Sequence, residues 1–83
     1  MELRSFEEFR KEVLRRLKEN ESNWKSQAKT FEEYIANNDA ENYIKSGYKD
    51  YTSSYQIKPN SHMTPDNYFN ASVEPVIWNI EMS

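Results

Sequence analysis

The chain has 83 residues, of which 36% are hydrophobic and 30% charged, and its formal net charge is −3. This length predicts one small domain spanning residues 1–83, and the lack of cysteine excludes disulfides and thiolate metal sites. The single glycine excludes glycine-rich phosphate loops, and the charged first residues predict neither a secretory signal nor a membrane span, so we expect a cytoplasmic protein.

The first predicted element is an amphipathic helix over about residues 6–19. Ser5 and Glu8 have the spacing of a capping box, in which each side chain bonds a free backbone N–H at the helix start. Apolar residues follow at intervals of three and four, which is the pattern of one buried helical stripe. They are Phe6, Phe9, Val13, Leu14 and Leu17.

A second helix is predicted after residue 20, and its start has two interpretations. Thr30 and Glu33 repeat the capping-box spacing, which favours a helix that begins at Thr30. The stripe of Trp24, Ala28, Phe31 and Ile35 instead favours one helix over about residues 21–37, and we prefer this interpretation. The likeness of "SFEEF" to "TFEEY" then reflects the same helix-start chemistry and not a duplicated unit.

The chain after residue 38 is predicted to change from helix to strand. Asp39 is placed to cap a short third helix, which Gly47 ends. Aromatic and β-branched residues then alternate with polar ones, which predicts an extended segment over residues 48–57. The residues expected on one face of this segment are Tyr51, Ser53, Tyr55 and Ile57.

The last part of the chain is predicted to be a loop followed by a strand. Residues 58–67 are rich in proline and asparagine, and Thr64 with Pro65 suits the start of a helical turn. Residues 72–82 alternate, so Val76, Trp78, Ile80 and Met82 are expected on one buried face, with Pro75 at the strand entrance.

The predicted fold is therefore α+β. Two amphipathic helices and a short third, within about residues 5–47, would pack on a small antiparallel β pair formed by the C-terminal half, about residues 48–83. An isolated β pair is marginally stable, so the helical stripes would have to cover its apolar face.

Catalytic and metal-binding constellations are weak in this sequence. The sole histidine, His62, lies in the predicted loop without a nucleophile motif, and it is expected to face solvent. Neither His62 with Asp66 nor Asp39 with Glu41 has the spacing of a defined metal site. We therefore expect no enzyme, no cofactor and no catalytic or metal-binding residue.

A concentration of tyrosines is the strongest candidate for a binding surface. Tyr43, Tyr48, Tyr51 and Tyr55 lie close together in the sequence, and tyrosine is enriched at protein interfaces. The alternative, which we favour, is that these tyrosines complete a core that has few aliphatic residues. The predicted partner-binding residues are Tyr48, Tyr51 and Tyr55 with the nearby acids Asp39, Glu41 and Asp50.

The sequence thus favours a non-enzymatic module that binds a larger protein, such as a small acidic inhibitor or an immunity-type regulator. The comparison with phage or mobile-element inhibitors is an analogy of size and charge only. One form of it has the acidic face imitate a nucleic-acid backbone. Homo-oligomerisation through exposed aromatic residues stays open.

The alternative function is a nucleic-acid-binding regulator that uses the basic residues of the first helix. Residues 1–29 carry eight Lys and Arg against six Asp and Glu, whereas residues 30–83 carry three against eight. The acids within the first helix favour paired, solvated charges over a nucleic-acid surface. The cations concerned are Arg10, Lys11, Arg15, Arg16 and Lys18.

Overall fold

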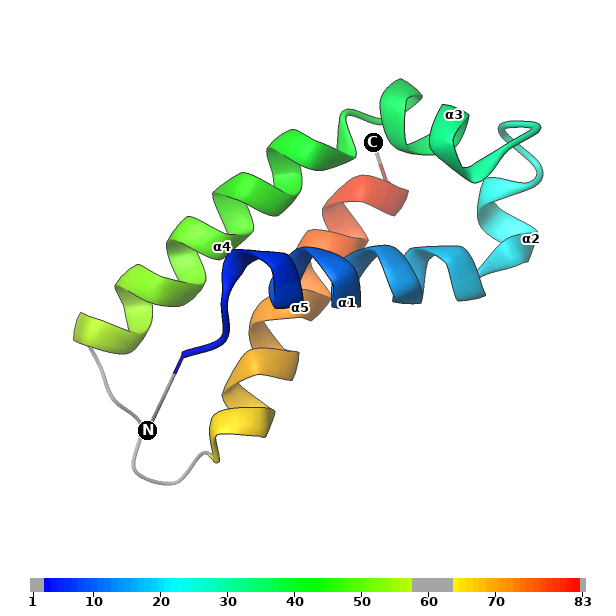
Figure 1. Ribbon diagram of the computed structural model, residues 1–83. Coiled ribbons are helices and arrows are strands. Elements are labelled where there is room, and N and C mark those ends of the chain that lie inside the picture. Colours follow the sequence, from blue (N-terminus) through cyan, green and yellow to red (C-terminus); the bar gives the residue numbers. More distant parts are fainter. Residues whose placement is uncertain (1–2, 58–63, 83) are drawn as a thin grey trace.

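The computed structural model describes residues 3–57 and 64–82, and for residues 54–57 it describes the backbone alone. Five helices follow one another in this part of the chain, and it contains no strand (Figure 1). They are α1 (Phe6–Glu19), α2 (Glu21–Trp24), α3 (Phe31–Asn37), α4 (Ala40–Ile57) and α5 (Pro65–Glu81). The predicted α+β fold with an antiparallel β pair is therefore wrong.

Helix α1 agrees with the sequence prediction in its bounds and its start. The Ser5 hydroxyl accepts a hydrogen bond from the Glu8 backbone N–H at 3.2 Å. Phe9, Val13 and Leu17 are buried along the predicted stripe. A capped start and one apolar face are sufficient to define this helix without reference to the rest of the fold.

The preferred single helix over residues 21–37 is wrong, because α2 and α3 are separate. The Asn23 carbonyl accepts from the Ser26 hydroxyl at 2.8 Å and from the Gln27 side-chain amide at 3.2 Å, which competes with the helical ladder. Thr30 is extended, and its hydroxyl accepts from the Glu33 N–H at 3.1 Å. The alternative start at Thr30 is thus the one that the structure adopts.

Helix α4 replaces both the short third helix and the predicted strand over residues 48–57. Gly47 does not end a helix here: its φ is not positive, and it lies inside α4. A Cβ at this position would overlap Cγ2 of Val76 in α5 and lie 3.6 Å from Cζ of Phe9. The glycine therefore serves close packing between α4 and α5, and the helix continues through it.

Helix α5 replaces the predicted C-terminal strand and contains Pro75 in its interior. The start was correctly recognised, because the Thr64 hydroxyl accepts from the Asn67 N–H at 3.1 Å and Pro65 is the first helical residue. The alternation after residue 72 indicated a strand that does not form. Packing against α1 and α4 maintains the helix across the proline, which usually interrupts one.

The core lies between α1, α4 and α5, and α2 and α3 close one end of it, where α1 ends and α4 begins (Figure 1). The contact between α4 and α5 is the most extensive. No described helix combines the length and the apolar character needed to cross a bilayer. The buried residues are Phe9, Val13, Leu17, Trp24, Tyr34, Ala40, Ile44, Tyr51, Phe69, Val73, Val76 and Ile80.

Candidate functional site

The predicted tyrosine surface is largely turned inward. Tyr51 is 2% exposed, and its hydroxyl accepts a hydrogen bond from the Arg4 N–H at 3.0 Å. Tyr48 is half-buried and donates its hydroxyl to the Arg4 carbonyl at 2.8 Å. Both rings lie against Phe9, with centroid separations of 5.4 and 5.5 Å. These two tyrosines therefore fix the segment before α1 to α4; the side chain of Tyr55 lies outside the described residues.

The three acids predicted beside the tyrosines do not form one surface patch of free carboxylates. Asp39 has a φ of 55°. Both of its carboxylate oxygens accept hydrogen bonds from the side-chain amide of Asn42, at 2.9 and 2.8 Å. Glu41 is paired with Arg10 through contacts of 2.6 to 3.1 Å. Asp50 is exposed on α4. Glu41 therefore neutralises a cation that the alternative hypothesis assigns to nucleic acid.

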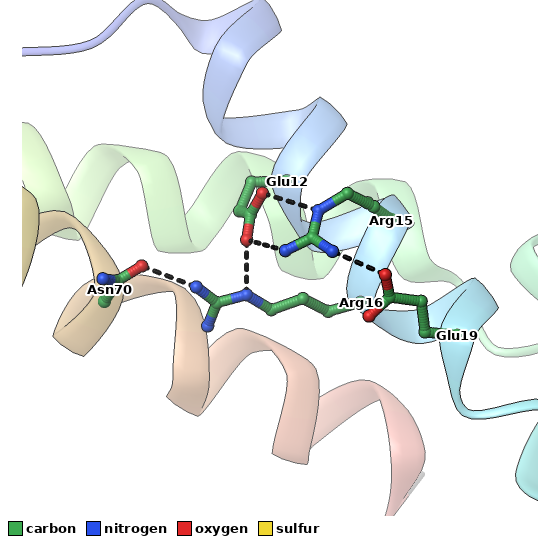
Figure 2. A network of polar contacts seen from close by, with 5 residues as sticks. All are labelled: Glu12, Arg15, Arg16, Glu19 and Asn70. Carbon is green, nitrogen blue, oxygen red and sulfur yellow. Dashed lines mark hydrogen bonds and ion pairs between the residues drawn. The ribbon is translucent and has the colours of Figure 1, made fainter.

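The other arginines of α1 are also engaged within the protein (Figure 2). Arg15 donates to Glu12 at 2.7 and 3.0 Å and to Glu19 at 2.6 Å. Arg16 donates to Glu12 at 2.5 Å and reaches the Asn70 side chain of α5 at 2.5 Å. Lys11 and Lys18 are exposed. The network joins α1 to α5 and leaves little of the arginine charge available to a polyanion.

The ion pairs with arginine lower the pKa values of Glu12 and Glu41. Hydrogen bonds from Arg15, and then from Arg16, lower the pKa of the Glu12 carboxyl from its ordinary 4.5 to about 2, although partial burial acts in the opposite direction. The hydrogen bond from Arg10 likewise lowers the pKa of Glu41. These shifts stabilise the charged forms, so the ion pairs persist at neutral pH.

A hollow of about 600 Å³, open to solvent, lies at the connection between α2 and α3 and is lined by residues 25–29 and Glu33. Three of its polar side chains are bonded locally: Lys25 pairs with Glu21 at 2.8 Å, and Ser26 and Gln27 donate to the Asn23 carbonyl. Such local bonding explains the shape of the connection without a ligand. This hollow is therefore a weak candidate for a site.

Among the side chains that the structure describes, the large apolar ones that remain exposed lie on the outward face of α5 and at its C-cap, Met82. Trp78 is 57% exposed and Met82 is 85% exposed. Ala71 and Pro75 are exposed on the same face, since the four residues follow one another at intervals of four, three and four. We call Ala71, Pro75, Trp78 and Met82 the outer stripe. A stripe of this kind on a monomer marks a candidate interaction surface.

The outer stripe lies opposite the face that enters the core. Phe69, Val73, Val76 and Ile80 repeat the same spacing of four, three and four, two residues out of phase, and are buried. Helix α5 is thus apolar on two sides. Packing on the core of this chain requires only one apolar side. The core explains one side and leaves the other without a structural role.

The charges beside the outer stripe are mainly acidic. Helix α5 contains Asp66, Glu74 and Glu81 and no lysine or arginine. Asp66 is paired with Arg4, and Glu81 accepts from the Asn20 amide at 2.8 Å. Glu74 is exposed, and no ion pair joins it to the residues that the structure describes. Asp66 is therefore balanced by Arg4, and Glu74 and Glu81 are the α5 carboxylates that lie beside the outer stripe.

The sequence analysis missed this surface because it assigned the wrong period. Alternation placed Val76, Trp78, Ile80 and Met82 on one buried face, and the structure buries only Val76 and Ile80. The signal was present in the helical spacing of Ala71, Pro75, Trp78 and Met82, but Pro75 argued against a helix.

Comparison with protein-family models, curated proteins and solved structures gave no match to this chain. Within residues 3–57 and 64–82, no group of three or more His, Asp or Glu side chains is arranged to hold a metal ion. The prediction that His62 faces solvent in a loop concerns a residue outside the described ranges. The outer stripe is thus the candidate that the geometry itself singles out.

Proposed function

We propose that this protein is a non-enzymatic protein-binding module and that its partner docks on the outer stripe of α5. The observation that carries the proposal is the exposure of Trp78 and Met82, 57% and 85%, one helical turn apart on a face that the core does not use. Tryptophan and methionine are enriched in the buried centres of interfaces, and tryptophan is among the side chains that contribute most binding energy.

The sequence-based surface around the tyrosines has less support. Tyr51 lies in the core, and Tyr48 and Glu41 are held by Arg4 and Arg10. Their substitution would disturb folding before it could report on binding. We therefore assign the proposed partner-binding role to α5. The form of the proposal that we keep is an inhibitor or regulator that acts on a larger protein.

The nucleic-acid alternative also has less support. Arg10, Arg15 and Arg16 form ion pairs with carboxylates of the same protein, and releasing them would leave those carboxylates facing a polyanion. Lys11 and Lys18 alone give a small positive charge, and the protein carries a net charge of −3. Binding driven by phosphate contacts is disfavoured by these charges.

The test is affinity capture with the substitution pair Trp78→Ser and Met82→Ser, compared with Lys45→Ser and Lys49→Ser on the exposed side of α4. We expect the α5 pair to unfold within about 1–2 kcal/mol of the wild type, because both side chains are more than half exposed. We also expect a stoichiometric protein partner, captured from cells that make the protein, to be lost with the α5 pair and retained with the α4 pair. If the α5 pair captured as much of the partner as the wild type, the proposal would be contradicted.

A further inference from the structure

We infer that the partner segment bound by the outer stripe is a basic amphipathic helix. The inference rests on the proposed function and adds the chemistry of the partner. It joins two observations on α5: an apolar stripe spaced at intervals of four, three and four, and two flanking carboxylates, Glu74 and Glu81, on a helix that contains no lysine or arginine.

The shape of the surface favours a helix as the occupant. The outer stripe extends from Ala71 to Met82, about three turns or roughly 16 Å along the axis of α5. Its side chains form a ridge on a convex helix, and ridges of this kind pack into the grooves between side chains of a second helix. The described residues present no strand edge to which an extended peptide could add.

The charge beside the outer stripe favours a basic occupant. Glu74 lies one turn before Trp78, and Glu81 lies beside the last turn, where the helix dipole is already negative. Across the junction with α1, Glu12 and Glu19 balance Arg15 and Arg16, so that network adds no net positive charge (Figure 2). Lysine or arginine flanking an apolar stripe would complement this arrangement.

Pro75 removes one helical hydrogen bond from the same face of α5. A proline has no backbone N–H, so the Ala71 carbonyl receives no helical hydrogen bond from residue 75. Both residues belong to the exposed outer stripe. The group of this face that an arginine or lysine can bind is the carboxylate of the exposed Glu74.

The same charges argue against a second copy of this chain as the occupant. Two α5 helices packed through Trp78 would bring the Glu74 and Glu81 carboxylates of both copies to one interface, and α5 offers no cation to pair with them. Like charges placed opposite each other at an interface disfavour that pairing. The surface is therefore better suited to a partner of opposite charge than to itself.

The test uses the purified full-length protein and two fluorescent 18-residue peptides measured by anisotropy at physiological salt. The first peptide carries leucines at helical spacing with flanking lysines, and the second has every lysine replaced by glutamate. We expect the lysine peptide to bind at least about tenfold more tightly than the glutamate peptide. Trp78→Ala should weaken its binding about tenfold or more.

Two charge reversals of equal size distinguish the effect of a charge beside the outer stripe from the effect of the protein's net charge on peptide binding. Glu74→Lys should weaken binding of the lysine peptide about three- to tenfold, because it places a cation beside Trp78. Asp50→Lys is the matched control, since Asp50 is also exposed but lies on α4. We expect it to weaken binding less than about twofold.

Four outcomes would overturn the inference. Equal effects of Glu74→Lys and Asp50→Lys would mean that only net charge attracts the peptide. Equal binding of the two peptides would remove the charge preference and leave the proposed function in place, and binding of neither would remove the basic helix as the occupant. A dimer in sedimentation that Trp78→Ala dissociates would identify a second copy as the occupant. The proposed function fails separately, in the capture experiment.

Discussion

At the scale of single residues, many charged side chains of this protein are engaged with one another. Glu12 is the centre of the network at the junction of α1 and α5, and it accepts from both Arg15 and Arg16 (Figure 2). The three side chains belong to one helix at intervals of three and four, so the pairing could be read from the sequence. The bond from Arg16 to Asn70 could not, because it depends on how α5 crosses α1.

The lowered pKa of Glu12 gives a pH-dependent contribution to stability. Its carboxyl has a pKa of about 2 when folded against an ordinary 4.5, so the contribution is complete above about pH 4.5 and is lost as the pH falls toward 2. The arginine side chains are 52% and 26% exposed, and solvent screening reduces the expected contribution to about 1–2 kcal/mol.

Glu12→Gln tests this assignment. Urea unfolding of both proteins at several pH values should show the wild type more stable by about 1–2 kcal/mol at pH 6, with the difference shrinking as the pH falls from about 4.5 to 2.5. Glu32→Gln is the control, because Glu32 is exposed on α3 and no ion pair joins it to the described residues. A difference that is constant with pH would contradict the assignment.

At the scale of helices, the close approach of α4 and α5 is the feature that sequence patterns missed. Glycine commonly ends a helix, and proline commonly prevents one, so Gly47 and Pro75 both argued for boundaries. In the structure Gly47 makes room for Val76, and Pro75 lies on the outward side of α5. Tertiary packing decided both positions, and no local pattern contains that information.

Gly47→Ala tests the close approach directly. In an unconstrained helix this change stabilises by about 0.5–1 kcal/mol. Here the new methyl group would overlap the buried, β-branched Val76, and we expect a net loss of about 1–3 kcal/mol in thermal or denaturant unfolding.

Two further variants distinguish steric overlap with Val76 from other causes of a loss of stability in Gly47→Ala. Val76→Ala should make room for the new methyl group, so Gly47→Ala should cost at least about 1 kcal/mol less in that background than in the wild type. Ser46→Ala changes the adjacent exposed position and should stay within about 0.5 kcal/mol. A Gly47→Ala protein more stable than the wild type would refute the close approach.

At the scale of the whole molecule, the sequence predicted the helical first part and misassigned the second. The capped, single-faced α1 and the start of α5 at Thr64 were predictable because their signals are local. Helix α4 was not, since Tyr51, Ser53 and Tyr55 alternate while the stripe that is actually buried passes through Gly47. That misassignment also hid the outer stripe, because a strand would have buried Trp78.

The aromatic residues of the molecule lie in two kinds of environment, the core and the surface. Phe9, Tyr51 and Phe69 form the contact between the three long helices, with ring centroids 5.5 to 5.9 Å apart. Trp78 takes no part in that cluster and is directed to solvent. A small domain with few aliphatic residues places a tryptophan outside its core at a cost in buried apolar surface, which a binding role for α5 accounts for.

The most direct measurement is site-specific photo-cross-linking in cells that make the protein, with the photoreactive residue at position 78 in one variant and at position 50 in the other. Both positions are exposed, but they lie on α5 and α4. The account predicts a discrete cross-linked protein from position 78 and none from position 50. A cross-link from position 50 alone, or none from position 78, would contradict it.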